Sequence, residues 1–317
     1  MCVGTLVLGL RFEPLTCYTH KGRACLAQCR MTLEEKTFGG NSYTLCNVVV
    51  GVMTDQTVIL STTDGVATIT LNRPTVLNAL NLSASEALAK AIQSCKDDNN
   101  VRAVLLTGAG RGFCAGGDMK AAWEHHQAGG DVRHFFGDLT VPLHRAITDI
   151  RLMEKPVIAA INGTAGGGGM SLAMACDFRL AAENARLKQA YTSIGLVPDL
   201  GWTAIVPQII GGARTMELLL TDPVLDAKQA LALGLVHEIV PDDRLLERAR
   251  AVSTQLAHGP TTAFGGAKAL VNATLFPLLE TQLERERQRL VTQAGTEDFL
   301  EGLSAFMQKK SPRFRGR

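Results

Sequence analysis

The chain has 317 residues, of which 46% are hydrophobic and 20% are charged. This length and apolar content are enough for one large buried core, so we expect one sizeable domain with extensions. The formal net charge of +2 provides no strong field for nucleic acid or a membrane surface. No apolar run reaches the roughly 18–20 residues that a membrane-spanning helix needs. We therefore expect neither nucleic acid nor a membrane as a partner.

The N-terminal segment differs in composition from the rest of the chain. Five of the 8 cysteines lie ahead of Met53, and residues 1–52 show no helical or strand periodicity of useful length. We predict that residues 1–52 are a non-native or disordered extension that does not pack on the core. The later cysteines are typical of small buried hydrophobes in a reducing compartment, so we expect a cytoplasmic protein.

A β-hairpin is the first element predicted after this segment. Apolar residues alternate from Val58 onward, and Asp64-Gly65 supplies a turn. The Ser83-Ala-Ser-Glu86 pattern then predicts a capping box that opens a helix. Apolar residues at helical spacing between Leu88 and Cys95 give that helix one buried face.

Two glycine-rich stretches are the most informative local patterns. Arg111-Gly-Phe-Cys-Ala-Gly-Gly-Asp-Met119 follows a strand-like run at 101–107, and Asn162-Gly-Thr-Ala-Gly-Gly-Gly-Gly-Met170 follows another at 156–161. Glycine lets the backbone approach a ligand closely, and the N–H groups that open a following helix are free to donate. Two such turns side by side can aim two amides at one oxygen, which is the construction of an oxyanion hole.

The remaining pattern predicts an α/β protein. The strand at 156–161, a helix over 166–175 and a strand over 177–181 form a βαβ unit. A polar segment over 119–135 precedes a helix near 141–150, and everything beyond Asp243 has a helical pattern. We expect an α/β core with a helical C-terminal region.

Four segments, in order, give the chain a specific resemblance. Leu71–Leu80, Phe113–Lys120 and Lys155–Gly163 resemble hallmark segments of the crotonase (enoyl-CoA hydratase/isomerase) superfamily, over roughly Thr54–Arg317. The segment Ile194-Gly-Leu-Val-Pro-Asp199 resembles the branch of phenylacetate-pathway enoyl-CoA isomerases. A crotonase-like protein of this kind would act on an acyl-CoA thioester.

The resemblance also implies an architecture and an assembly. It implies a spiral of ββα units over 53–250, followed by a C-terminal helical region over 251–317 that mediates oligomer and CoA contacts. The expected assembly is a homotrimer or a dimer of trimers. Coenzyme A would be part of the substrate, so no separate cofactor and no metal ion are expected.

The catalytic residues that the resemblance implies lie in the glycine loops and after them. The amides of Gly117 and Gly168 match the donors that stabilise the enolate oxygen. The two glutamates of true hydratases correspond to Ser171 and Tyr191, and neither is a general base near neutral pH, since a free tyrosine titrates near pH ~10. Water addition by two glutamates is therefore in doubt.

Asp199 remains as the candidate base. It lies where the isomerase branch and the chlorobenzoyl-CoA dehalogenases have their catalytic aspartate, and its alternative role is to cap the helix that follows. A dehalogenase would also need a histidine near residues 113–120, and none is present there. The other histidines, His144 among them, have no acid or nucleophile at a telling spacing and are assigned to structure or surface.

Substrate binding is expected from the same segments. Val76 and Leu77 match the loop that flanks the pantetheine, and Ala115 matches the residue whose carbonyl meets the adenine. The C-terminal helix contributes a patch that reaches CoA. The expected substrate-binding residues are Val76, Leu77, Ala115, Gly117, Asp118, Met119, Lys120, Gly168, Tyr191, Phe306 and Lys309.

These observations favour an enzyme that moves the double bond of an enoyl-CoA thioester. Asp199 would take a proton from one carbon and return it to another, while Gly117 and Gly168 hold the enolate. The alternatives are a hydratase or an acyl-CoA hydrolase with replaced acid/base groups, and a non-catalytic acyl-CoA-binding subunit. The identity of the acyl group, aliphatic or aromatic, is left open.

Overall fold

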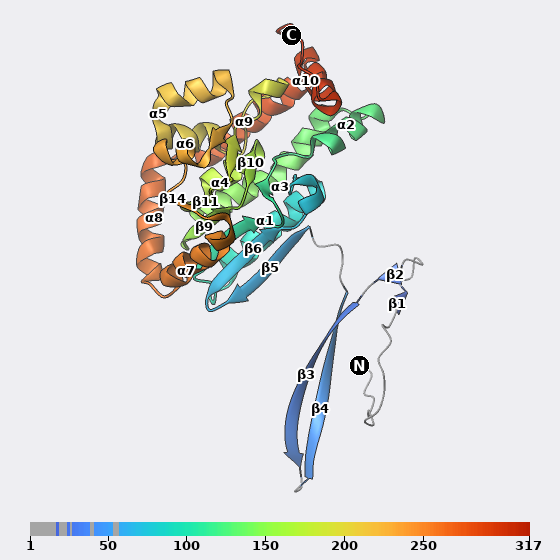
Figure 1. Cartoon of the computed structure of the whole chain (residues 1–317), viewed down its shortest axis with the longest axis vertical. Coiled ribbons are helices and arrows are strands. Elements are labelled where there is room, and N and C mark those ends of the chain that lie inside the picture. The colour runs from blue at the N-terminus through green and yellow to red at the C-terminus, as the bar shows by residue number, and fades with distance from the viewer. Residues whose placement is uncertain (1–16, 19–23, 26, 39–40, 53–56) are drawn as a thin grey trace. The chain divides into compact units, whose positions relative to one another are not determined.

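The computed structural model describes residues 17–18, 24–25, 27–38, 41–52 and 57–317. The chain divides into two compact units, Met1–Gln56 and Thr57–Arg317 (Figure 1). In the first unit, β3 (Ala27–Phe38) pairs antiparallel with β4 (Asn41–Val52). The short strands β1 (Cys17–Tyr18) and β2 (Ala24–Cys25) pair in the same sense. The sequence showed no strand periodicity of useful length here. The interpretation of residues 1–52 as a non-native or disordered extension stays a prediction.

The second unit is built on a six-stranded sheet with the order β14-β11-β9-β7-β6-β5. The predicted hairpin is present, with β5 and β6 antiparallel around the turn at Asp64-Gly65, where both residues have positive φ. The other neighbours in this sheet pair in parallel. The strands are β5 (Val58–Thr63), β6 (Val66–Leu71), β7 (Ala103–Gly108), β9 (Val157–Ile161), β11 (Phe178–Ala182) and β14 (Glu238–Val240).

A second sheet, of four short strands, has the order β13-β12-β10-β8. Three strands of the large sheet each lead through a short loop into a strand of the small one: β7 into β8 (Gly112–Cys114), β9 into β10 (Thr164–Gly166), and β11 into β12 (Arg186–Lys188). A helix follows β8 and another follows β10. The last strand of this sheet is β13 (Leu225–Asp226). This repeat is the predicted spiral of ββα units, and the predicted fold class is confirmed.

The large sheet is buried on both faces, as its near-continuous apolar strands require. Alternate residues of one strand belong to two different clusters: Leu106 to one, and Leu105 to the other. The first cluster includes residues of α1 (Leu82–Asp97) and α3 (Val132–Leu152), and the second includes residues of α7 (Leu245–Ala257). Helices therefore cover the sheet from two sides (Figure 1).

Two helices begin at other residues than the sequence predicted. Helix α1 is capped by Asn81, whose side chain accepts a hydrogen bond from the Ala84 amide, so the predicted capping box at Ser83 was wrong. Asparagine two residues earlier already satisfies the first turn. Helix α3 begins at Val132 rather than near Val141, and it runs through Pro142. The polar segment ahead of it also forms α2 (Met119–Gln127).

The C-terminal part is helical, as predicted. Helix α9 packs against α3 and α5, and α10 packs against α2. No helix in the described part of the chain is long and apolar enough to cross a membrane. The remaining helices are α4 (Gly168–Ala175), α5 (Trp202–Thr221), α6 (Ala227–Ala232), α8 (Thr261–Leu275), α9 (Leu279–Ala294) and α10 (Glu297–Gln308).

Candidate active site

A cavity of about 520 Å³ opens where the two glycine loops, α3, the loop before α5, and α10 meet. Of the expected substrate-binding residues, all but Lys309 line it, and so does Asp199. Lys309 instead ends α10 in a left-handed conformation. Segments that lie far apart in the sequence thus share one cavity, and their roles in binding stay predictions.

The two glycine loops are in direct contact beside this cavity. A Cβ atom on Gly116 would lie only 3.1 Å from the amide nitrogen of Gly168, and Gly116 has a φ of +96°. Both conditions require glycine. Gly168 is the first residue of α4, where the amide has no acceptor inside the helix, and Gly117 lies just before the N-cap of α2. The backbone therefore places the two expected oxyanion donors on the same cavity.

The loop around Val76 is tied to the first glycine loop. The Asn78 amide group donates to the Gly112 carbonyl at 2.8 Å, and the Leu80 amide donates to the Gly116 carbonyl at 2.7 Å. Asp118 accepts from the Arg73 guanidinium at 2.9 Å and from the Ala121 amide at 3.1 Å. One Asp118 oxygen thus caps α2 and the other pairs with Arg73, so this carboxylate fixes the shape of the loop.

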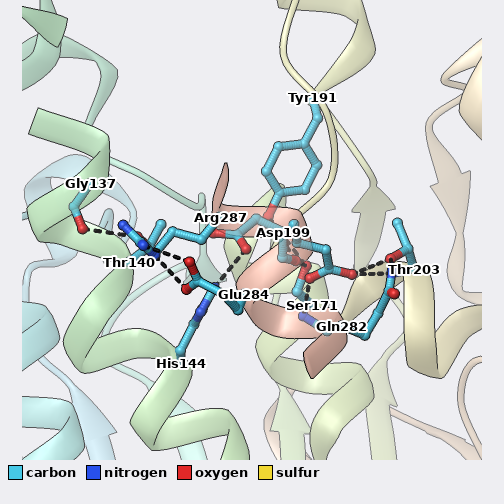
Figure 2. Close-up of polar contacts among 12 residues, drawn as sticks. Gly137, Thr140, His144, Ser171, Tyr191, Asp199, Thr203, Gln282, Glu284 and Arg287 are labelled. Atoms are coloured by element: carbon cyan, nitrogen blue, oxygen red, sulfur yellow. Dashed lines mark hydrogen bonds and ion pairs between the residues drawn. The ribbon is translucent and has the colours of Figure 1, made fainter. Parts of the chain in front are cut away.

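The two positions that correspond to hydratase glutamates converge on one carbonyl. The Ser171 hydroxyl donates to the Asp199 backbone carbonyl at 2.8 Å, and the Tyr191 hydroxyl lies 3.4 Å from the same oxygen (Figure 2). The two hydroxyls are 3.3 Å apart. Burial, reinforced by the charge of Asp199, raises the pKa of Tyr191 well above its usual value. Tyr191 is therefore a neutral phenol, and both side chains support the loop that carries Asp199.

The Asp199 side chain meets a histidine. Asp199 Oδ1 lies 2.7 Å from His144 Nε2, on α3 (Figure 2). Only 3% of the Asp199 side chain and 13% of the His144 side chain are exposed. No acid lies at a telling spacing from His144 in the sequence, and the structure brings this histidine to Asp199; its assignment to structure or surface stays a prediction. In the folded chain it lies one helical turn after Thr140, which lines the cavity.

The first amides of helix α5, which follows Asp199, are bound by another carboxylate. The buried side chain of Glu286, on α9, accepts hydrogen bonds from the Gly201 amide at 2.7 Å and from the Thr203 amide at 2.9 Å. The N-cap residue of α5 is Gly201, so the predicted alternative of an Asp199 side-chain cap does not occur. Burial, followed by the nearby charge of Asp199, raises the pKa of Glu286 to about 7.

The site and the fold agree with what the chain resembles. The family model for enoyl-CoA hydratase/isomerase matches residues 61–317. A 1,2-epoxyphenylacetyl-CoA isomerase of Escherichia coli is 38% identical over 260 residues, which cover 80% of this chain and 96% of that protein. A probable enoyl-CoA hydratase of Rhodobacter capsulatus is 37% identical, covering 84% of this chain and all of that one.

A solved structure gives the same result. The crystal structure of an enoyl-CoA hydratase from Mycobacterium avium subsp. paratuberculosis is 34% identical, with a TM-score of 0.74, and the match covers 82% of this chain and 98% of that one. An α/β spiral that brings two glycine loops to one cavity defines an acyl-CoA enzyme of the crotonase type. The chain belongs to the enoyl-CoA hydratase/isomerase family, as its four motifs predicted.

Proposed function

We propose that this enzyme shifts the double bond of an enoyl-CoA thioester, with Asp199 as the base. The observation that carries the proposal is the chemistry of the cavity wall. Asp118 and Asp199 are the carboxylates among the described residues that line it, and Asp118 is engaged by Arg73 and the Ala121 amide. Ser171 and Tyr191, in the hydratase glutamate positions, are neutral hydroxyls that hold the Asp199 carbonyl.

The reaction balances with one base. Asp199 removes a proton from the carbon next to the thioester carbonyl of a 3-enoyl-CoA, and the electrons move into a dienolate whose oxygen accepts from Gly117 and Gly168. Asp199 then returns a proton to the far carbon of the dienolate, which yields the 2-enoyl-CoA. No metal and no cofactor beyond the CoA of the substrate takes part in this scheme.

The side chains that line the cavity favour a substrate whose acyl chain is apolar. Phe136, Leu139 and Leu143, all buried, present one apolar face of α3. Arg111 and Lys120 line the same cavity and offer positive charge for phosphate groups. Relatives named as an isomerase and as hydratases are consistent with either reaction, so the replaced glutamates favour isomerisation over hydration.

Product identification tests this function. We expect purified enzyme to convert 3-hexenoyl-CoA and 2-hexenoyl-CoA into each other, with the two isomers distinguished by chromatography against standards and any other product identified by mass. Hydration would instead add the mass of water, and hydrolysis would release free CoA. Formation of 3-hydroxyhexanoyl-CoA as the main product from 2-hexenoyl-CoA would contradict the proposal and favour a hydratase with unusual acid/base groups.

We also propose that the enzyme works in the cytoplasm as a homotrimer or a dimer of trimers. Large apolar side chains on α5 and α8 support an assembly, since Leu220 is 78% exposed and Leu270 is 74% exposed. Light scattering on the purified protein tests this, and a monomeric mass at micromolar concentration would contradict it.

A further inference from the structure

Polar side chains lie one after another behind Asp199. Asp199 Oδ1 bonds to His144 Nε2 at 2.7 Å. Beyond His144 lie Glu284 and Arg287 of α9, which pair at 2.7 Å (Figure 2). Side-chain exposure rises along the row, from 3% at Asp199 and 13% at His144 to 33% at Arg287 and 47% at Glu284. The row therefore runs from the cavity wall to solvent.

Both ends of the His144–Asp199 pair are open. In the described part of the chain, Asp199 Oδ2 and His144 Nδ1 have no hydrogen-bond partner, and neither is among the fully buried atoms that lack one. Asp199 lines the cavity, so its second oxygen is the one that meets substrate. The second ring nitrogen of His144 is free to bond to water, and 13% of the His144 side chain is exposed. One group thus touches each compartment, and a 2.7 Å hydrogen bond joins them.

From this arrangement we propose that His144 carries protons between Asp199 and bulk solvent. The inference rests on the proposed role of Asp199 as the base. During the transfer the neutral imidazole carries its proton on Nδ1, so that Nε2 can accept. After Asp199 takes a proton from substrate, rotation of its carboxyl group presents that proton to His144 Nε2, and Nδ1 releases its own proton to water. The reverse transfer supplies a solvent proton to Asp199, which delivers it to the dienolate. Histidine suits this role because its neutral and charged forms interconvert near physiological pH. The hydrogen that is transferred during isomerisation then exchanges with solvent hydrogen.

The charged and polar groups around the pair come from three parts of the chain. Glu284 and Arg287 of α9 lie on the solvent side, where hydrogen bonding to Arg287 lowers the pKa of Glu284 to about 2. Glu286 of α9 and Tyr191 interact electrostatically with Asp199 on the buried side. On α3 itself, Arg145 pairs with Asp149. Glu284 therefore stays ionised near neutral pH and places a negative charge on the solvent side of the pair.

Deuterium content of the product tests the relay. Isomerisation of 3-hexenoyl-CoA in D₂O, analysed by mass at low conversion, should give wild-type product that carries solvent deuterium. His144→Gln keeps a donor at the position of Nε2 but cannot carry the proton, so deuterium content should fall several-fold while slower turnover persists. His134→Gln, an exposed histidine on the same helix, should behave as wild type. If the variant is slow, a single turnover with enzyme in excess gives the same measurement, the deuterium content per molecule of product.

Two results would overturn the relay. Equal deuterium content in wild type and His144→Gln would mean that His144 only orients Asp199, and wild-type product free of deuterium would mean that the proton never leaves Asp199. The pH profile of turnover adds a second readout, since its shape should differ between wild type and His144→Gln if the imidazole exchanges protons with solvent. Phenylacetyl-CoA separates the relay from the proposed function, because its α-hydrogens can exchange with D₂O although it has no enoyl double bond to shift. If its α-hydrogens exchange but hexenoyl-CoA is not isomerised, the relay is supported and the proposed function is contradicted.

Discussion

The oxyanion half and the acid/base half of the site are built in different ways. In the proposed mechanism Gly117 and Gly168 act through backbone amides, and two local glycine motifs determine their geometry. The proposed base Asp199, its partner His144 and the helix-capping Glu286 are side chains of three separate segments that meet only in the folded chain. A local motif can therefore be recognised in a sequence, whereas a side-chain network has to be found in a structure.

Asp199→Asn should have the largest effect, because it removes the base and leaves the backbone half intact. We expect isomerisation to fall by about 10²–10⁴-fold, the usual contribution of a general base. Affinity for acyl-CoA, measured by calorimetry, should change only a few-fold. Because the side chain of Glu286, and not that of Asp199, accepts hydrogen bonds from the start of α5, the melting temperature should stay near that of wild type. Wild-type turnover in this variant would eliminate Asp199 as the base.

Gly168→Pro removes one backbone donor of the oxyanion half and leaves the acid/base side chains in place. Proline is favoured at the first position of a helix, so the fold should persist while the N–H group disappears. We expect kcat to fall by about 10²–10³-fold. Gly168→Ala is the matched control, since it also places a Cβ atom 2.9 Å from Leu200 Cδ1 but keeps the amide hydrogen. Equal losses in the two variants would assign the effect to crowding and not to the missing donor.

Glu286→Gln should change the pH dependence of stability. The pKa of Glu286 in the folded chain, about 7, lies above its ordinary value of 4.5. Such a shift contributes stability that is present below the unfolded pKa and is lost as pH rises through about 7. The loss is up to about 3 kcal/mol. Urea unfolding at pH 5 and pH 8 should show this drop in wild type and a much smaller one in the variant. An identical drop in both proteins would count against this origin.

Tyr191→Phe should have the smallest effect of the four. Its hydroxyl makes only long contacts, of 3.3 Å to Ser171 and 3.4 Å to the Asp199 carbonyl, and Ser171 alone still holds that carbonyl at 2.8 Å. We expect a change in kcat of a few-fold at most and a loss in the free energy of unfolding of about 1 kcal/mol. A collapse of turnover in this variant would instead indicate a hydratase or hydrolase in which tyrosine takes part in the chemistry.

The difference between the two halves explains what the sequence could predict. The hairpin at Asp64-Gly65, the glycine loops and the βαβ unit depend on short-range patterns and were found. The capping box failed because Asn81, just ahead of it, caps α1 first. The full length of α3 was missed because Pro142 and a polar first half obscure its helical period.

His144 was missed for a different reason. It lies 55 residues from Asp199, and no spacing rule connects a position on α3 with a loop that follows β12. Glu286 lies 85 residues from Gly201 and could not be predicted from the sequence either, because a helix cap supplied by a distant helix has no local sequence signature. These side chains meet because α3 and α9 pack together, which only the tertiary structure shows.

The fate of solvent oxygen tests the central claim most directly. Wild-type enzyme would be incubated with 2-hexenoyl-CoA and 3-hexenoyl-CoA in water enriched in heavy oxygen, and every product would be weighed by mass spectrometry. A single base at Asp199, with hydroxyls at 171 and 191, predicts interconversion of the two enoyl-CoA isomers with no heavy oxygen in either. Heavy oxygen in a 3-hydroxyacyl-CoA or in a released carboxylic acid as the dominant product would contradict the account.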